Sequence, residues 1–365
     1  MSAVGVLSPV QRRSCPSEIP IHVTIHHILV RLSAASIYGR FRNSFRALYR
    51  SRHCWNTTVE KRKSMQREWD LTMWIGYSLM LTLLLWYVPT QASAESDPVL
   101  VGAGDIAECW FELFNGTGGA EATATLLDRI EGAVFTTGDH AYRKGTAKEF
   151  QACYTPTWGR HKARTRPTPG NHDFDTQNAA PYYAYFGASA GEAGKGYYSY
   201  DLGTWHIVAL NSNLTADAAA VQAQWLQEDL AAHKTLCTLA YWHHPVFSSG
   251  GHGNGHRMRT IWPVLYEFGA DVVVNGHDHD YERFAQQTPD GVLDQARGIR
   301  EFVVGTGGAH LRGFKTIQPN SEIRNDTTWG VLKLTLHSTS YEWEFVPVAG
   351  STFRDAGSAA CVSPR

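Results

Sequence analysis

Short apolar runs alternate with polar segments from about residue 98 onwards, and this pattern predicts a mixture of strands and helices. Runs of about four to eight apolar residues, rich in β-branched types and bounded by Gly or Pro, are typical of buried strands. Five such runs are followed directly by clusters of Asp, Asn, His or Tyr. Further strands are expected at Tyr197–Asp201, Trp205–Ser212, Glu301–Gly305, Val331–Leu336 and Tyr341–Val346.

Four segments have the longer apolar spacing of helices: Ala120–Ile130, Thr146–Tyr154, Ala216–Lys234 and Arg257–Phe268. In the third, one face is expected to carry Val221, Trp225, Leu226 and Leu230. The alternation within Val331–Leu336 predicts a half-buried strand. Helices mixed with strands early in the chain, and hairpins late in it, fit two stacked sheets flanked by helices. Because the last part, of about 270 residues, contains no low-complexity linker or repeat, it is expected to form one domain.

The five polar clusters supply metal-ligand side chains at the ends of predicted strands. In α/β sheets, ligands bind at the carboxyl ends of strands. Oxygen and nitrogen donors without any cysteine suit iron, zinc or manganese better than a thiolate zinc site. The clusters are Asp105 after Val99–Gly104, Asp139 with Tyr142 after Ala133–Gly138, Asn171-His172-Asp173 after Arg166–Gly170, His243-His244 after Thr238–Trp242, and His277 with His279 after Ala270–Val274.

Each cluster has a simpler interpretation when it is taken alone. An Asp after Gly at a strand end is often a helix N-cap, Tyr142 would be a core aromatic, and Asn171 a turn residue with positive φ. Among the other histidines, His256 fits a solvated loop, His206 and His337 fit packing or surface positions, and His310 is ambiguous. The five clusters in this order are what favour a metal site.

The order Gly-Asp, Gly-Asp, Gly-Asn-His-Asp, His and Gly-His-x-His resembles all five sequence blocks of the calcineurin-like metallophosphoesterases, over roughly residues 98–350. Within that family the chain looks most like the purple acid phosphatases. They have a tyrosine three residues after the second aspartate, as Tyr142 follows Asp139, and they continue the last block as Gly276–Arg283 does here. Most other members carry a histidine at the position of Ala107, so the missing ligand and its replacement by Tyr142 agree.

The resemblance implies an α/β fold, a four-layer αββα sandwich of two mixed sheets flanked by helices. It also implies a site for two metal ions, one held by Asp105, Tyr142 and His279, the other by Asn171, His243 and His277, with Asp139 bridging them. His243 is preferred over His244 because the family's ligand lies two residues before the proline, here Pro245. A tyrosinate is a hard anionic ligand, so Fe(III) is expected on the first site, paired with a divalent iron, zinc or manganese ion.

Three further histidines are expected to act on the substrate. In the family pattern, His172 would lie over the substrate phosphate and protonate the leaving group, a role suited to an imidazole. His252, in the Ser248–His256 loop, resembles a substrate-contacting histidine of purple acid phosphatases, and His244 is a second candidate for phosphate contact.

The N-terminal part of the chain differs in charge from the rest. Residues 1–64 hold 11 Lys and Arg against 2 acids, a net charge of +9, whereas residues 95–365 hold 21 against 30, a net charge of −9. The first segment is interpreted as a basic leader, either disordered or an over-extended start of translation, with a transit peptide as the third interpretation. The acidic remainder argues against nucleic acid as a partner, because phosphate backbones need basic surface.

The uncharged apolar run Leu71–Val88, followed by Pro89 and Ala92-Ser93-Ala94, is typical of a signal peptide. We expect residues 65–94 to be a signal peptide cleaved after Ala94, and residues 95–365 to be a secreted or extracytoplasmic catalytic domain. The run is also long enough to span a bilayer. A retained signal-anchor is therefore the alternative, and only then would a membrane be a partner.

Four cysteines remain after the leader, and an even number in an exported chain suggests two disulfides with three possible pairings. We predict Cys109–Cys153 and Cys237–Cys361, with free buried thiols as the alternative.

The leading hypothesis is an exported phosphatase that hydrolyses small phosphomonoesters by attack of metal-bound hydroxide on phosphorus. One alternative is a phosphodiesterase that uses the same two metal ions. An alternative of another class is a non-catalytic phosphate- or metal-binding surface protein, against which the complete ligand set argues. Residues 248–256 and 312–328 are expected to line the cleft and to decide between monoester and diester.

Overall fold

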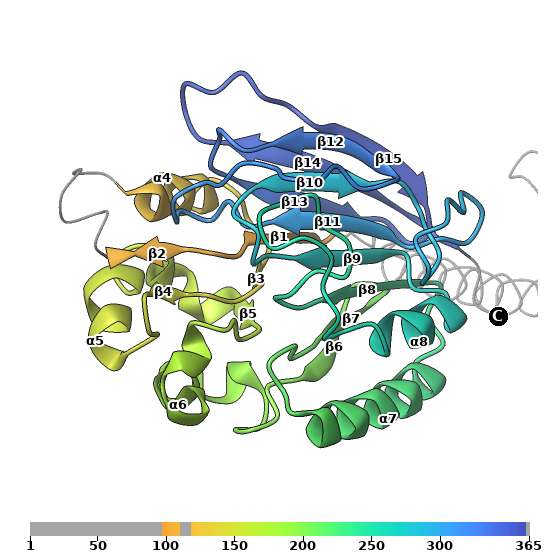
Figure 1. Cartoon of the computed structure of the whole chain (residues 1–365), viewed down its shortest axis with the longest axis horizontal. Helices are drawn as coiled ribbons and strands as arrows, with labels where there is room; N and C mark the ends of the chain where they lie inside the picture. The colour runs from red at the N-terminus through yellow and green to blue at the C-terminus, as the bar shows by residue number, and fades with distance from the viewer. Residues whose placement is uncertain (1–96, 110–117, 363–365) are drawn as a thin grey trace, which may run out of the picture. The chain divides into compact units, whose positions relative to one another are not determined.

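The computed structural model describes residues 97–109 and 118–362, all within the compact unit Ala92–Arg365 (Figure 1). The predicted basic leader, signal peptide and cleavage point after Ala94 lie outside the described residues. Among the residues that are described, no helix is both long and apolar enough to cross a membrane.

The first sheet has six strands, of which the three that end in the predicted site run parallel to one another. β1 pairs in parallel with β3, and β3 in parallel with β5, whereas β13, β14 and β15 extend the sheet in antiparallel fashion from β1. In order across the sheet, the strands are β15 (Ala356–Ala360), β14 (Ser340–Pro347), β13 (Gly330–Leu336), β1 (Val99–Ala103), β3 (Ala133–Thr136) and β5 (Thr165–Pro167).

The second sheet has seven strands and is also mixed. Its centre, formed by β7, β8, β9 and β11, is parallel, and its edges are antiparallel. In order, the strands are β12 (Ser321–Asn325), β10 (Tyr281–Phe284), β11 (Arg300–Val304), β9 (Val272–Asn275), β8 (Cys237–Tyr241), β7 (Trp205–Ala209) and β6 (Tyr198–Leu202). A short parallel pair, β2 (Ala107–Glu108) and β4 (Ala141–Tyr142), lies beside the ends of β1 and β3.

All four predicted helical segments contain helix. They appear as α4 (Gly119–Leu127), α5 (Ala147–Glu149) continued by the π-helical turn η1 (Phe150–Tyr154), α7 (Ala216–Ala232) and α8 (Ile261–Glu267). The structure adds α6 (Ala180–Phe186) and the short 3-10 helices η2 (Trp158–Arg164), η3 (Asp173–Asp175), η4 (Gln177–Ala179) and η5 (Gly187–Ala190). α5 begins at a capping box, in which Glu149 N–H donates to the Thr146 hydroxyl and Thr146 N–H donates to the Glu149 carboxylate.

The core is divided into layers by the alternation of strand side chains. In β7, Ile207 and Ala209 belong to the buried cluster that also contains Leu100, Val331 and Leu332 of the six-stranded sheet, so this cluster fills the space between the sheets. Val208, between them, packs instead with the helix side chains Leu226 and Trp262. Figure 1 shows α7 and α8 on the outer side of the seven-stranded sheet. The predicted αββα sandwich of two mixed sheets is confirmed.

The buried face of α7 differs from the prediction at one position. Leu226 and Leu230 are buried, as expected, but Val221 is 59% exposed. The next residue, Gln222, is buried in its place because its side-chain amide accepts from Asn211 N–H and donates to Asn211 C=O. These two hydrogen bonds offset the cost of burying the amide, so Gln222 can occupy the buried position instead of Val221.

β13 has the predicted alternation. Lys333 and Thr335 are partly exposed, whereas Leu332, Leu334 and Leu336 are buried. Val331 lies on the polar side of the alternation but is buried as well, so only the second half of the strand is half-buried.

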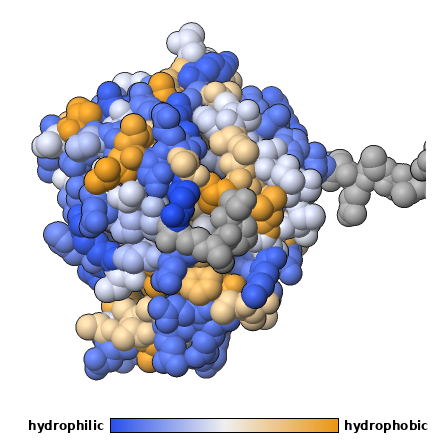
Figure 2. All heavy atoms as spheres, turned by 90° about the vertical axis from the view of Figure 1, so that its right-hand side faces the viewer, coloured by the Kyte–Doolittle hydropathy of each residue, from blue (hydrophilic) through white to orange (hydrophobic). Residues whose placement is uncertain are grey.

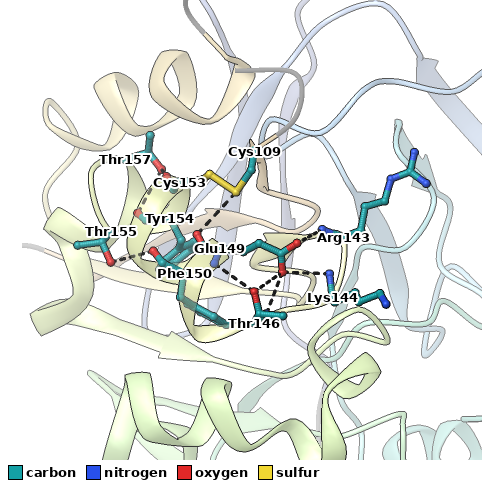
Figure 3. The surroundings of a disulfide bond; sticks show 10 residues. All are labelled: Cys109, Arg143, Lys144, Thr146, Glu149, Phe150, Cys153, Tyr154, Thr155 and Thr157. Carbon is teal, nitrogen blue, oxygen red and sulfur yellow. Dashed lines mark hydrogen bonds between the residues drawn. A yellow bond between two sulfur atoms is a disulfide. The ribbon is translucent and has the colours of Figure 1, made fainter. Parts of the chain in front are cut away.

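Both predicted disulfides are present, Cys109–Cys153 and Cys237–Cys361. Figure 3 shows the first beside the Thr146–Glu149 capping box, where it joins the residue after β2 to η1. The second joins the first residue of β8 to the residue after β15, and so connects an edge of one sheet to the centre of the other.

One face of the molecule is shown in Figure 2. Where the structure describes it, this face is mostly hydrophilic, and its apolar residues lie in small separate groups. Scattered apolar side chains of this kind are normal on a protein surface.

Candidate metal centre

The five predicted clusters meet at one edge of the two stacked sheets. Asp105 follows β1, Asp139 follows β3 and Asn171 follows β5, while His243 follows β8 and His277 follows β9. The connection between the sheets is direct, because His277 N–H donates to Asp105 Oδ2 at 2.8 Å. Parallel neighbours end at the same edge, which is why segments far apart in the sequence converge here.

The backbone at this edge is strained at three of the predicted ligands. Asp105, Asp139 and His277 have φ values of 58°, 51° and 71°, a region that residues other than glycine rarely adopt. Such conformations cost about 1–3 kcal/mol each and cluster at functional sites. Asn171 is not among the residues with positive φ, so its interpretation as a left-handed turn residue is wrong.

The two aspartates do not cap helices. Asp139 Oδ1 accepts from His172 N–H at 2.8 Å, and Asp105 Oδ2 accepts from His277 N–H at the same distance. Each carboxylate is therefore oriented by a loop amide from another cluster, with its second oxygen directed at the remaining side chains.

The first group of donors surrounds the Tyr142 hydroxyl. This oxygen lies 2.8 Å from Asp105 Oδ1, 3.1 Å from Asp139 Oδ2 and 3.1 Å from His279 Nε2. His279 Nε2 is also 3.3 Å from Asp105 Oδ1. These four side chains converge on one small volume.

The second group surrounds the Nε2 atom of His243. It lies 3.0 Å from Asn171 Oδ1, 3.2 Å from His277 Nδ1 and 3.3 Å from Asp139 Oδ2. Asp139 Oδ2 thus belongs to both groups, as a bridging carboxylate would.

The chemistry of this donor set fits cations. His243 Nδ1 donates to Thr137 C=O at 2.7 Å, and His279 Nδ1 donates to His310 C=O at 2.8 Å. A carbonyl only accepts, so these bonds hold the proton on Nδ1 and leave a lone pair on each Nε2. Both lone pairs face carboxylate or amide oxygens, an arrangement that is repulsive unless a proton or a metal ion lies between them.

The pKa shifts of these groups also indicate that the site favours positive charge. Burial alone would lower the pKa of His243, but the charge and hydrogen bond of Asp139 raise it to about 9. Burial would raise the pKa of Asp139, but the charges of His243 and His172 hold it well below its usual range. Burial, followed by Asp105 and Asp139, raises the pKa of Tyr142 well above 10. A tyrosinate at this position therefore needs a strongly charged metal ion beside it.

His172 lies at the more exposed side of the centre, with 29% of its side chain exposed. Its Nδ1 donates to Arg143 C=O at 2.5 Å and lies 3.2 Å from Asp175 Oδ2. Its Nε2 is 4.0 Å from Asp139 Oδ2, so it faces the donor groups without belonging to either. This geometry suits a proton donor to a bound ligand better than a metal ligand.

His244 and His252 lie on either side of His277. The His244 ring is buried, its centroid 4.4 Å from that of His277, and its Nδ1 bonds to the Ser212 hydroxyl at 2.8 Å. Burial, followed by the charge of His243, lowers the pKa of His244. His252 stacks on the His277 ring with centroids 4.0 Å apart and is 40% exposed. The structure therefore brings both predicted substrate histidines to the centre, His244 beneath it and His252 on its exposed side.

The Ser248–His256 loop is held by an acidic residue that the sequence analysis left without a role. Asp278, between the two ligand candidates of the last block, accepts from His252 N–H and Nδ1 at 2.8 Å each and from the Ser248 hydroxyl. Burial raises the pKa of Asp278, but these hydrogen bonds bring it down to about 2. The only sequence feature that pointed to a role for Asp278 was its position between the candidate ligands His277 and His279.

Asp173 and His140 form a second support. Asp173 Oδ2 accepts from Gly170 N–H at 2.8 Å and from Asp139 N–H at 3.1 Å, and it lies 2.9 Å from His140 Nδ1. The buried carboxylate thus ties the Asp139 loop to the Asn171 loop. His140 directly follows the predicted ligand Asp139, and Asp173 follows Asn171 by two residues, so their positions in the motif were the available signal.

The four other histidines that the sequence pattern brought up lie outside the two donor groups. His206 is buried between Asp201 and Asp229, and His337 is partly exposed and pairs with Asp97. His256 is exposed, and His310 is exposed beside Glu108.

Comparison with known proteins identifies a matching family. The family model described as calcineurin-like phosphoesterase matches residues 99–281. Among curated proteins, the chain is 32% identical to purple acid phosphatase 15 of Arabidopsis thaliana over 220 residues, which are 50% of this chain and 41% of that protein. It is 26% identical to purple acid phosphatase 18 of the same plant over 271 residues, 66% of this chain and 57% of that protein. The chain spans about half the length of these relatives.

Solved structures show the same fold. A purple acid phosphatase from yellow lupin (Lupinus luteus) seeds matches 73% of this chain and 54% of its own, with a TM-score of 0.58 and 19% identity. The protein described as the anchor in the inner membrane complex of Plasmodium matches 74% of this chain and 90% of its own, with a TM-score of 0.55 and 12% identity. At these identities the likeness concerns the fold alone.

Proposed function

The chain belongs to the calcineurin-like phosphoesterase family, and from this premise we propose that it is an exported phosphatase that hydrolyses small phosphomonoesters at a centre for two metal ions. The observation that carries the proposal is the convergence of seven side chains in two groups that share Asp139 Oδ2. The purple acid phosphatases among its relatives support the choice of a phosphatase within the family.

We assign the metal ligands as the sequence predicts them. Asp105, Tyr142 and His279 would hold the first ion, Asn171, His243 and His277 the second, and Asp139 both. Two metal ions bound there would neutralise the charge of a phosphate ester and make water nucleophilic near neutral pH. Because the pKa of Tyr142 is raised without a cation, we propose Fe(III) for the first ion and a divalent iron, zinc or manganese ion for the second.

The protein's own groups have separate tasks in this proposal. His172 donates from Nδ1 to Arg143 C=O, which turns Nε2 towards the centre, and in its imidazolium form it would donate the proton of Nε2 to the leaving alkoxide. His252 donates from Nδ1 to Asp278 on the exposed side of the centre, and in its imidazolium form it would donate from Nε2 to a phosphate oxygen. His244 packs beneath His277 and supports its ring from the buried side.

Export is supported by the two disulfides, because such bonds persist in oxidising compartments. The domain boundaries, with a leader at 1–64, a signal peptide at 65–94 and a catalytic domain at 95–365, are part of this proposal. No nucleic acid is expected as a partner of the acidic domain.

The test is the turnover of a chromogenic phosphomonoester and of its matching diester by the full chain, each with and without a chelator. Turnover that is sensitive to the chelator and favours the monoester is expected. The same sensitivity with a preference for the diester would replace the phosphatase by a phosphodiesterase. If metal-loaded, folded protein turned over neither, the proposal would fail in favour of a binding role, a possibility that matters because the fold also occurs in a protein described as an anchor.

A further inference from the structure

We propose that His206, Asp229 and His233 form a separate metal site, which binds one zinc ion and connects α7 to the seven-stranded sheet. The inference goes beyond the proposed function, because none of these residues belongs to the two donor groups of the candidate metal centre. His206 is the second residue of β7, which runs parallel to β8. The site therefore lies towards the amino ends of the parallel strands, whereas the metal centre lies beyond their carboxyl ends.

The three side chains bring their donor atoms close together. One ligand atom from each lies within 4.8 Å of the other two. His206 Nε2 is 2.7 Å from Asp229 Oδ2, and His233 Nδ1 is 3.4 Å from Asp229 Oδ1. Two donors of a tetrahedral zinc ion are about 3.3 Å apart, since each bond to zinc is about 2.0–2.1 Å long. Small movements of these side chains are therefore enough to admit the ion.

Two of the three ligands come from the carboxyl end of α7. Asp229 and His233 are four residues apart, a spacing that places both on the same side of a helix. His233 directly follows α7, where the helix dipole favours a cation. Its ring stacks on that of His206 with centroids 4.3 Å apart, and its side chain is 41% exposed. The exposed ring can turn towards an ion, and the open side leaves room for water as the fourth ligand.

The buried histidine is positioned by a carboxylate on its other nitrogen. Asp201 lies directly opposite His206 in the β6–β7 ladder, and its Oδ1 is 2.9 Å from His206 Nδ1. This bond holds a proton on Nδ1 and so leaves Nε2 to the metal. The Ser199 hydroxyl donates to Asp229 Oδ1 at 2.8 Å and orients the second ligand. Hydrogen bonds of this kind commonly support the ligands of metal sites.

The local charges also suit a cation. Within residues 97–109 and 118–362, no Lys or Arg nitrogen lies within 4.0 Å of the carboxylates of Asp201 and Asp229, whose ion-pair partners are histidines. Without metal, a proton between His206 Nε2 and Asp229 Oδ2 supplies the positive charge. A zinc ion takes the place of this proton, which passes to the solvent. Two imidazoles and one carboxylate are a donor set that suits zinc.

The test compares the zinc content of variants of the full chain. After chelation, incubation with ZnCl2 and dialysis, elemental analysis is expected to find one zinc ion per chain fewer in His233→Gln than in the wild type. His337→Gln is the matched control, because it removes a partly exposed histidine that pairs with a carboxylate, Asp97, outside both metal sites. Circular dichroism would check that both variants are folded.

A second variant tests the positioning role of Asp201. By calorimetry with ZnCl2, Asp201→Asn is expected to bind the ion at this site about tenfold more weakly than the wild type. Zinc is also expected to raise the Tm of the wild type by more than that of His233→Gln, because the ion stabilises only the folded chain.

An Asp139→Asn background separates this site from the metal centre. Zinc binding at the centre is weakened there, whereas the difference of one zinc ion between His233 and its Gln variant is expected to persist. Equal zinc contents of the wild type and His233→Gln would overturn the inference. An equal loss of zinc in His337→Gln would also overturn it, because binding would then be unspecific.

Discussion

Asp139 is the residue on which both halves of the candidate centre depend. Its Oδ2 lies 3.1 Å from the Tyr142 hydroxyl and 3.3 Å from His243 Nε2, and its backbone is held in a left-handed conformation by neighbouring loops. No other side chain among the described residues joins the two donor groups in this way.

We predict that Asp139→Asn abolishes turnover. An amide carries no charge and bridges two cations poorly, so metal content is expected to fall and kcat/KM to decrease at least about 100-fold. Elemental analysis and the chromogenic assay measure the two effects. Asp128→Asn, which changes an exposed carboxylate away from the centre, is the control. A fully active, metal-free Asp139→Asn protein would contradict the two-metal proposal.

Tyr142→Phe tests the identity of the first ion. The ring is kept and only the oxygen that faces Asp105, Asp139 and His279 is lost. If ferric iron is bound, visible absorption from charge transfer between the phenolate and the iron is expected to disappear, although part of the iron remains. Spectroscopy combined with iron analysis measures this. A colour that survived the substitution at full intensity would remove Tyr142 from the ligand set.

At the scale of elements, α7 is attached to the seven-stranded sheet by a buried ion pair that involves none of the ligands proposed for the two-metal centre. His206 of β7 bonds through Nε2 to Asp229 of α7 at 2.7 Å and through Nδ1 to Asp201 of β6 at 2.9 Å, and its ring stacks on that of His233. Burial would lower the pKa of His206, but the two aspartates raise it above 6.5. Burial would raise the pKa of Asp229, but the hydrogen bonds from His206 and Ser199 and the charges of His206 and His233 together lower it.

This pair makes the stability of the protein depend on pH. A group whose pKa is raised in the folded state stabilises it fully below the unfolded value, here about 6.5, and loses that contribution as the pH rises through the folded value. His206→Gln is therefore expected to lower the free energy of unfolding by about 2–3 kcal/mol at about pH 5.5, and by less at about pH 8.5. Urea unfolding at both pH values measures the difference. An equal loss at both would show that the ring acts through packing alone.

The elements themselves were predictable where the local pattern was strong. β7, β13 and α7 have long apolar periodicity, and all three appear near the predicted bounds. β12 and β15 were missed because Ser321–Asn325 and Ala356–Ala360 contain few large apolar residues. Such edge strands form because a neighbouring strand offers hydrogen-bond partners, a cause that lies outside the segment.

At the scale of the whole molecule, the disulfides connect segments that are distant in the sequence. Cys237 and Cys361 are separated by 124 residues, and Cys109 and Cys153 by 44. A cross-link stabilises mainly by restricting the unfolded chain, and the effect grows with the logarithm of loop length.

We predict that Cys237→Ser/Cys361→Ser lowers the free energy of unfolding by about 2–5 kcal/mol. The loss for Cys109→Ser/Cys153→Ser is expected to be about 1 kcal/mol smaller because its loop is shorter. Thermal or denaturant unfolding of both double variants measures the order. A larger loss from the shorter loop would mean that local packing around Cys109 and Cys153 matters more than chain entropy.

The sequence by itself determined the fold class and the set of side chains that converge at the centre. It could do so because each ligand candidate stands directly after an apolar strand, and parallel strands end at a common edge. Only the tertiary structure decided which neighbouring residues position the side chains of the centre. Asp278 with His252, and Glu108 with His310, are pairs from distant segments of the chain. Their meeting depends on how two sheets pack, and neither local spacing nor hydrophobic pattern records that geometry.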